Sequence, residues 1–538
     1  MAVGATYPPP GYEGRVPIPS HVLRPQPAWP GLLALGFVAL VLRLLYATRS
    51  GIWRDEALGI AVARLPGVLD VLAFLRDHES HPPLFYLMLR GWAGLVGASD
   101  LALVVLPVAL GVLLVPAAYW VGNRVFSRPA GWLAALLAAT SPILTEHAAL
   151  VRPYSWLPLL GLGMAYALWR GLLGSGWRPW AAFGGLTALA LLTHNYAWVV
   201  LAGLDGVALI WLMVGDRRAL GGLAAAHALA FAIFAPWLPA FVHQVLHAGH
   251  APHPVSSPWI PLALVCKTFS SLPNAWAGGL VLAALLGLVA VAARRADGPT
   301  RLAYGIFVGA PLLVFLVSAA GSAYSDLLWP RTLLTVVPCL LVGAGGALAA
   351  LVPPRGLGVL ALAAAGVYAA IALTMLALPK SNAREIAAAV AARVQPTDLV
   401  VISPEWMAPG FNYYFSPANR QLDYPHDGRE AITPFDDVAG RMADPAAFQR
   451  AKATFAAQHA AGGRVWVVLD HQAVFPDYPR GDELPTDLRR THWNAVGLYR
   501  SAQLMGQLNA LYGKPNKEIR SSGIQASAES YVAFLFAP

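Results

Sequence analysis

Long apolar runs separated by short polar segments dominate this chain as far as Pro379. A helix that crosses a membrane needs about 20 predominantly apolar residues. Runs of this kind lie near 31–48, 101–122, 130–147, 155–172, 179–194, 196–214, 219–240, 276–293, 302–320, 331–351 and 356–377. The run 83–97 is shorter and contains Arg90. This pattern predicts a polytopic helical membrane protein.

Positive charge in the short loops decides whether 83–97 is a further span, because Lys and Arg concentrate in cytoplasmic loops. If 83–97 lies along the surface and the N-terminus is cytoplasmic, the basic loops all fall on the cytoplasmic side. They carry Arg124, Arg128, Arg170, Arg178, Arg217, Arg218, Arg294, Arg295, Arg301 and Arg355. If 83–97 spans, all of them move outside. We therefore expect about eleven spans, with 83–97 as a surface helix.

The composition changes after Pro379. Strands are expected at 399–402 and 465–469, and helices at 381–396, 445–461 and 499–512. Alternating strands and helices are typical of an α/β fold. An odd number of spans puts this part outside the cell membrane.

The expected fold class is therefore an α-helical polytopic membrane protein with a small C-terminal α/β extracytoplasmic domain. We expect a Pro-rich, disordered cytoplasmic tail over 1–30, a transmembrane catalytic domain over 31–379 and the α/β domain over 380–538. The first external loop covers 49–100.

Composition supports the membrane assignment and excludes a nucleic-acid partner. Of the 538 residues, 57% are hydrophobic and 12% are charged, against about 25% charged in soluble domains. The net charge of +9 comes from arginines and lysines that sit mostly in the short loops, which is an orientation signal. The two cysteines, Cys266 and Cys339, have neither redox nor zinc-site spacing.

An acidic pair, Asp55-Glu56, follows the first apolar run directly. Carboxylates at a membrane boundary are costly unless they have a function. Either residue can act as a general base that takes a proton from an acceptor hydroxyl; the alternative is a pair that only ends the helix and neutralises Arg54. We predict that Asp55 and Glu56 are catalytic.

The same topology brings further polar residues to the external side. They are His78, Glu79, His81, Arg152, Tyr154, His194, Lys267, Asp326 and Arg331. The arginines suit a phosphate, which guanidinium groups bind in bidentate fashion. The alternative is that an arginine such as Arg152 only anchors its helix at the membrane interface, next to a tyrosine of the aromatic belt. We predict that all nine residues contact the substrate.

Histidines near these positions also allow a divalent metal, but nothing in the sequence requires one. The densest group is His243, His247, His250 and His253.

Three features together resemble the GT-C membrane glycosyltransferases. They are Asp55-Glu56 after the first span, His81-Pro82-Pro83-Leu84 before the surface helix, and Ser141-Pro142 followed by Arg152-x-Tyr154. The nearest branch comprises bacterial relatives of the protein O-mannosyltransferases and of the lipid A aminoarabinose transferase. The resemblance covers about 31–350. Val105 before Leu106-Pro107 departs from the family pattern, where an arginine is common.

The resemblance implies an inverting transfer at the external face of the bacterial cytoplasmic (inner) membrane. The donor would be a polyprenyl-phosphate-linked sugar, and the acceptor a lipid, a polysaccharide or a protein. Asp55 would be the base, and the donor site would be shaped by Glu56, His81, Arg152, Tyr154 and Arg331.

Two other functions fit a chain with many spans. A transporter or flippase would show inverted repeats and charges near the bilayer midplane, and the sequence shows neither. A non-catalytic receptor or assembly protein would depend on its external domain but not on Asp55.

Overall fold

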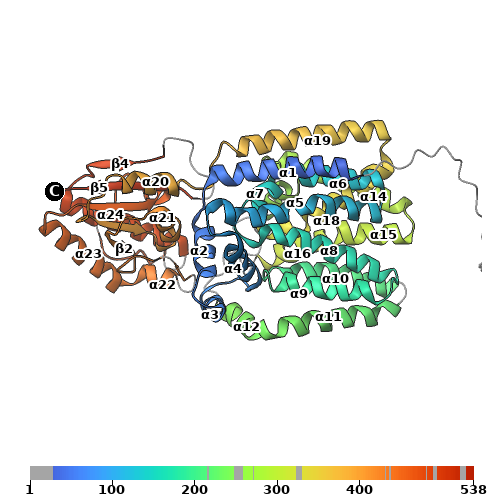
Figure 1. Cartoon of the computed structure of the whole chain (residues 1–538), viewed down its shortest axis with the longest axis horizontal. Helices are drawn as coiled ribbons and strands as arrows, with labels where there is room; N and C mark the ends of the chain where they lie inside the picture. Colours follow the sequence, from blue (N-terminus) through green and yellow to red (C-terminus); the bar gives the residue numbers. More distant parts are fainter. Residues whose placement is uncertain are drawn as a thin grey trace, which may run out of the picture.

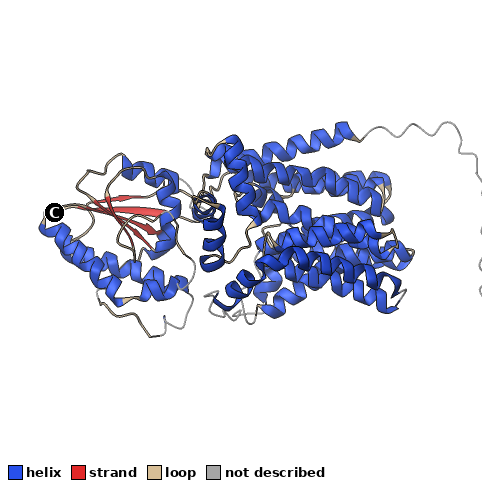
Figure 2. Cartoon of the chain, turned by 60° about the horizontal axis from the view of Figure 1, so that its bottom comes forward, coloured by secondary structure: helices blue, strands red, loops and turns tan. Residues whose placement is uncertain are grey.

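The computed structural model describes residues 28–214, 217–247, 259–270, 272–322, 330–430, 432–434, 438–479, 481–486, 488, 493–521 and 529–538. The expected disordered tail over 1–30 therefore lies almost entirely outside the described residues. Within them, a bundle of long helices stands at one end of the molecule and a small sheet with its helices at the other (Figures 1 and 2). We call these the membrane region and the α/β region.

One set of helices in the membrane region matches the apolar runs. They are α1 (Trp29–Ser50), α5 (Asp100–Val125), α6 (Arg128–Thr140), α8 (Trp156–Leu172), α9 (Trp177–Leu191), α10 (Ala197–Val214), α11 (Leu220–Phe234), α14 (Ala275–Arg295), α15 (Gly298–Tyr304), α16 (Ala310–Gly321), α18 (Val337–Leu351) and α19 (Pro354–Met375). A π-helical turn, η4 (Gly305–Gly309), joins α15 to α16.

Shorter elements connect the long helices. They are α2 (Arg54–Ala63), α3 (Val68–His78), α4 (Leu84–Val96), α7 (Pro142–Ala148), α12 (Leu238–His247), α13 (Trp259–Ser270), α17 (Pro330–Leu333), η1 (Pro153–Ser155), η2 (Arg217–Ala219), η3 (Ala235–Trp237) and η5 (Leu334–Val336).

Among the described residues, 8 helices are long and apolar enough to cross a membrane. The other three expected spans coincide with α6, α8 and α9, which have 13, 17 and 15 residues. The chain is therefore a multi-pass membrane protein, while the number of about eleven crossings stays a prediction.

The short apolar run 83–97 forms α4, a helix of 13 residues. Figure 1 shows α4 with α2 and α3 between the bundle and the α/β region. The α10–α11 and α14–α15 junctions, which carry basic residues, lie at the far end of the bundle (Figure 1). These two basic junctions and the acidic pair of α2 thus occupy opposite ends, as the loop charges predict. Which end faces the periplasm stays a prediction.

Small residues allow the membrane helices to approach closely. A Cβ atom added to Gly131 of α6 would lie 2.5 Å from the carbonyl oxygen of Tyr119 in α5. One added to Gly184 of α9 would lie 2.5 Å from the carbonyl oxygen of Ala226 in α11. Close backbone contact of this kind supplies the packing energy that a lipid solvent does not.

A buried arginine closes the end of α6. Arg43 of α1 is fully buried, and its guanidinium donates to the carbonyl oxygens of Ala39, Ala138 and Ala139 at 3.2, 3.0 and 3.3 Å. Two of these carbonyls belong to the last turn of α6, where helical partners are missing. The chain then turns at Ser141 into α7 and η1, the segment that carries Arg152.

The α/β region contains a five-stranded sheet in the order β2-β1-β3-β5-β4. Its strands are β1 (Leu399–Ser403), β2 (Arg420–Asp423), β3 (Val465–Asp470), β4 (Lys517–Ile519) and β5 (Tyr531–Phe536). Its helices are α20 (Ala383–Ala391), α21 (Ala408–Tyr414), α22 (Val438–Ala443), α23 (Pro445–Ala460) and α24 (Trp493–Tyr512), with the turns η6 (Glu405–Met407) and η7 (His471–Ala473).

β1 and β3 lie side by side in the middle of the sheet. β1 is parallel to both β2 and β3, with Val400 opposite Trp466. β5 is antiparallel to β3 and β4, with Val467 opposite Phe534. Every residue of β1 and β3 is buried, which fits their continuous apolar runs. The sequence pattern predicted β1 and β3 and missed the other three strands.

Candidate active site

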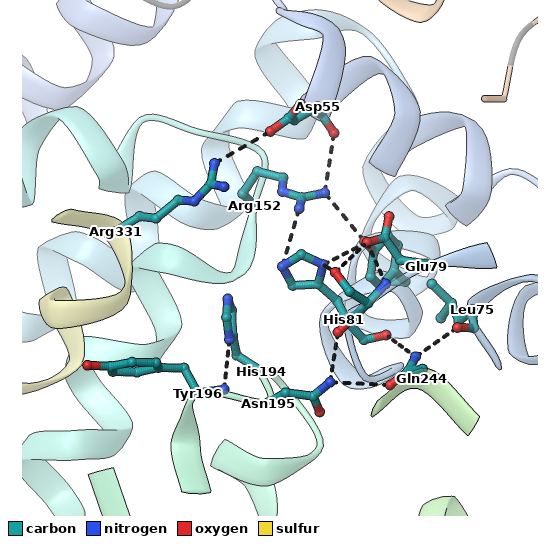
Figure 3. Close-up of polar contacts among 12 residues, drawn as sticks. Asp55, Leu75, Glu79, His81, Arg152, His194, Asn195, Tyr196, Gln244 and Arg331 are labelled. Carbon is teal, nitrogen blue, oxygen red and sulfur yellow. Dashed lines mark hydrogen bonds and ion pairs between the residues drawn. The ribbon is translucent and has the colours of Figure 1, made fainter. Parts of the chain in front are cut away.

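Asp55 lies in the first turn of α2, the helix that Figure 1 places between the bundle and the α/β region. Figure 3 shows its carboxylate near Arg152 and Arg331. Its Oδ2 is 3.8 Å from the guanidinium of Arg331, and its Oδ1 is 3.5 Å from Nε of Arg54. The side chain is 16% exposed. A partly accessible carboxylate with a cation on each side is therefore available to a ligand.

Arg152 lies beneath this carboxylate and is 5% exposed. It donates to the carbonyl oxygen of Asp55 and to the hydroxyl of Tyr86, both at 3.4 Å. Its third contact, at 3.5 Å, goes to Nε2 of His81. Its Nε is buried and has no hydrogen-bond partner among the described residues. Such a donor is costly to leave without an acceptor.

The buried Glu79 and the partly buried His81 form a pair beside Arg152 (Figure 3). The His81 Nδ1 is 2.7 Å from Oε1 of Glu79. Since a guanidinium can only donate, the Arg152 contact makes Nε2 of His81 an acceptor, and Nδ1–H then donates to Glu79.

The charges of this group follow from the same geometry. Burial lowers the pKa of His81, and the charge of Arg152 lowers it further, so the ring is neutral at neutral pH. Burial alone would raise the pKa of Glu79, but the His81 hydrogen bond and the Arg152 charge outweigh it and bring it to about 2.

His194 and Tyr154 complete the inner wall. The ring of His194 meets that of His81 edge to face at 4.7 Å between centroids and lies 6.3 Å from Tyr154. The adjacent Asn195 donates to the carbonyl oxygen of Ser80 at 2.8 Å. The turn after α9 is thereby fixed against the segment after α3.

Glu56 faces away from this cluster. It is fully buried, and its Oε2 is 2.6 Å from Nζ of Lys380. The same carboxylate accepts from the backbone N–H groups of Trp53 and Val151 at 3.1 and 2.6 Å. With both oxygens occupied, this geometry favours a structural role over the predicted catalytic one.

The remaining predicted residues are His78, Lys267 and Asp326. The His78 ring packs on Phe74, with centroids 5.3 Å apart. Lys267 is exposed on α13, and within the described residues no hydrogen bond or ion pair links it to the cluster. Asp326 lies outside the described residues.

The histidine run of the external loop 241–275 supplies no metal site among the described residues. Its members His250 and His253 lie outside the described residues, and Nδ1 of His243 is 3.1 Å from the carbonyl oxygen of Arg76. Within the described ranges, no three His, Cys, Asp or Glu side chains gather closely enough to hold a metal ion.

Sequence reasoning missed four residues that shape this site. Tyr86 lay in a run assigned to a surface helix, and Gln244 lay among the loop histidines, where it donates to the carbonyl oxygens of Leu75 and His81. Lys380 and Glu529 belong to the α/β region and carried no motif. The one sequence signal for either residue was the position of Lys380, a single lysine shortly after the last apolar run.

Comparisons with known proteins agree with this architecture. Residues 80–239 match the dolichyl-phosphate-mannose-protein mannosyltransferase family. Two crystal structures of ArnT from Cupriavidus metallidurans, one bound to undecaprenyl phosphate and one in the apo state, match with TM-scores of 0.58 and 0.59. Their identities are 14% and 16%, and each match covers 83% of this chain and 94% of ArnT.

A more distant likeness connects the chain to the Archaeoglobus fulgidus oligosaccharyltransferase, crystallised with Zn and sulfate. The TM-score is 0.51 at 14% identity, covering 82% of this chain and 67% of that one. No curated protein sequence matches this chain.

The matches to ArnT and to the oligosaccharyltransferase show that the chain has the GT-C fold, which confirms the predicted fold class. With the family match, the fold supports a glycosyltransferase of the GT-C type.

Proposed function

We propose that this GT-C-fold chain is an inverting glycosyltransferase that uses a polyprenyl-phosphate-linked sugar as donor. The acceptor is a hydroxyl of a lipid, a polysaccharide or a protein at the external face of the bacterial inner membrane. ArnT, which shares the fold, was crystallised with undecaprenyl phosphate, and a carrier of the same class suits a site at the end of a bundle of membrane helices.

One observation carries the proposal: a partly exposed carboxylate lies between arginines at the boundary of the membrane region. Asp55 is 3.8 Å from Arg331, and Arg152 donates to its backbone. A transfer from a phosphate donor needs a base for the acceptor and positive charge for the leaving phosphate. This arrangement supplies both within one group of residues.

The proposed step follows from these positions. Asp55 takes the proton of the acceptor hydroxyl as its oxygen attacks the anomeric carbon, opposite to the phosphate. The bond from the anomeric carbon to the phosphate oxygen breaks, and its electron pair leaves with the polyprenyl phosphate. Arg152 and Arg331 stabilise the negative charge that develops there. Attack from the opposite face inverts the anomeric configuration.

The neutral His81 and the ionised Glu79 have a different task. They hold Arg152 in one orientation, because its NH2 group donates to His81, whose other nitrogen donates to Glu79. A guanidinium fixed in this way loses little conformational entropy when a phosphate binds.

The decisive experiment measures transfer of labelled sugar from a polyprenyl-phosphate donor into a panel of membrane lipid, polysaccharide and protein acceptors. Asp55→Asn is compared with wild type, with Asp77→Asn as a matched control. Asp77 is a carboxylate of the same external loop whose hydrogen bonds go to the neighbouring Arg76. We expect Asp55→Asn to lower the rate by about 10²–10⁴-fold, as removal of a general base does, and Asp77→Asn to keep it.

Equal rates for wild type and Asp55→Asn would remove Asp55 from the mechanism. Absence of transfer by wild type with every acceptor of the panel would contradict the proposed function.

A further inference from the structure

The first backbone N–H group of α2, and the N–H of Ile52 just before the helix, are held by side chains of the α/β region. Arg54 N donates to Oε1 of Glu529 at 3.2 Å, and Ile52 N donates to the hydroxyl of Tyr414 at 2.6 Å. The first N–H groups of a helix have no partner within the helix, and the positive end of its dipole favours a carboxylate. A residue 475 positions away in sequence thus caps the helix that carries Asp55.

Glu529 is itself fixed from several sides. It is 4% exposed. Its Oε1 accepts from the hydroxyl of Ser381 at 2.5 Å, and its Oε2 accepts from that of Tyr531 at 3.2 Å. Its backbone N–H donates to the carbonyl oxygen of Lys380 at 3.1 Å. The carboxylate is therefore aimed at α2 and cannot turn to water without breaking these bonds.

The space around this contact admits no extra atom. A Cβ atom added to Gly410 of α21 would lie 3.1 Å from both Arg54 N and Oε1 of Glu529, and it would overlap the hydroxyl of Tyr531. Such contacts force a neighbour to move. The α/β region is thus tightly packed against the start of α2.

We infer that Glu529 is a positioning residue for the proposed transfer: it holds the N-terminus of α2, and through it Asp55, in the geometry that the reaction needs. The inference rests on the proposed function for its catalytic consequence. It gives the α/β region a part in fixing the geometry of the proposed active site.

The protonation state of Glu529 should make turnover depend on pH, which a purely structural contact would not do. The pKa of Glu529 is raised to about 7, and burial is the main cause. The charge of Asp55 also raises this pKa, whereas the charge of Arg54 and the Ser381 hydrogen bond lower it. Among the described residues, these groups and the hydroxyl of Tyr531 are the side chains that act on it. Below this pKa the carboxyl is neutral and holds the positive end of α2 more weakly. Turnover should therefore rise as the pH rises through neutrality.

The test measures kcat and donor KM of the full-length protein across neutral pH for three variants. Glu529→Gln should lower kcat at the alkaline end by about tenfold, leave the donor KM unchanged and abolish the rise near neutrality. Ser381→Ala should shift that rise to higher pH, because it removes a bond that lowers the pKa of Glu529. Glu518→Gln in β4, whose carboxylate pairs with Arg520 away from α2, should match wild type.

A wild-type kcat and pH profile in Glu529→Gln, or an unshifted rise in Ser381→Ala, would overturn the inference. Hydrogen exchange of residues 52–60 provides a second measurement that needs no turnover. Faster exchange in Glu529→Gln supports the cap, and unchanged exchange overturns it. Absence of transfer by wild type at every pH would instead count against the proposed function, and the exchange measurement would still decide the role of Glu529.

Discussion

The buried Glu56–Lys380 pair tests whether Glu56 has a structural role while Asp55 is the catalytic base. The two side chains are 0% and 2% exposed, and 2.6 Å separates Oε2 from Nζ. Removing one partner of a buried ion pair leaves an uncompensated charge, at a cost of about 3–5 kcal/mol. Replacing both partners with neutral groups of similar shape costs far less. The single variants Glu56→Gln and Lys380→Met should therefore be less stable than the double variant that combines them.

The structure also predicts which single change is worse. In Lys380→Met, the Glu56 carboxylate keeps the N–H groups of Trp53 and Val151 as donors, so the cost should fall near the lower end of that range. In Glu56→Gln, the ammonium of Lys380 has no other acceptor among the described residues. The cost should then approach the upper end.

The assay is thermal unfolding of the purified protein in detergent at a fixed scan rate, paired with the transfer assay. We expect apparent Tm values in the order wild type, double variant, Lys380→Met and Glu56→Gln, from highest to lowest. We also expect the double variant to retain transfer. A Glu56→Gln variant that melts like wild type but does not transfer would refute this reasoning and restore Glu56 as the catalytic carboxylate that its sequence position predicts.

Two further predictions follow from single contacts. Arg152→Lys keeps the charge but not the planar fork that reaches Asp55, Tyr86 and His81, so we expect the donor KM to rise by about tenfold, corresponding to about 1.4 kcal/mol; an unchanged KM would exclude Arg152 from the donor site. Gly161→Ala adds a Cβ that overlaps the carbonyl oxygen of Thr335, so we expect about 1–3 kcal/mol of destabilisation and a lower apparent Tm, and an unchanged Tm would show that α8 can move away from η5.

Much of the fold was predictable because hydrophobicity along the chain reports directly on burial in a membrane. The apolar runs became helices, and the run 83–97 became a short helix between the two regions. The strands that were missed show the limit of this signal. β4 has only three residues, and β5, Tyr531–Phe536, is an apolar run whose antiparallel pairing with β3 depends on a distant segment.

The candidate site was predictable to the extent that one face of the membrane collects its polar residues. Loop charge put Asp55, Arg152 and Arg331 on the same side, and the structure brings both arginines into contact with Asp55. Loop charge carries no information on which way a side chain points within that face. Glu56 therefore looked equivalent to Asp55 in sequence, although its carboxylate contacts Lys380 instead of the arginines.

The divergence of Asp55 and Glu56 has a geometric cause that explains why two acidic residues adjoin at this point. Consecutive residues of an α-helix point about 100° apart, so the first turn of α2 can direct one carboxylate to the arginines and the next to Lys380. One short helix then contacts both the proposed reaction centre and the α/β region. Because Glu529 caps the same turn, a shift of the α/β region would move Asp55 relative to Arg331. An acceptor that binds the α/β region and displaces it would change the position of the base, even without touching the base itself.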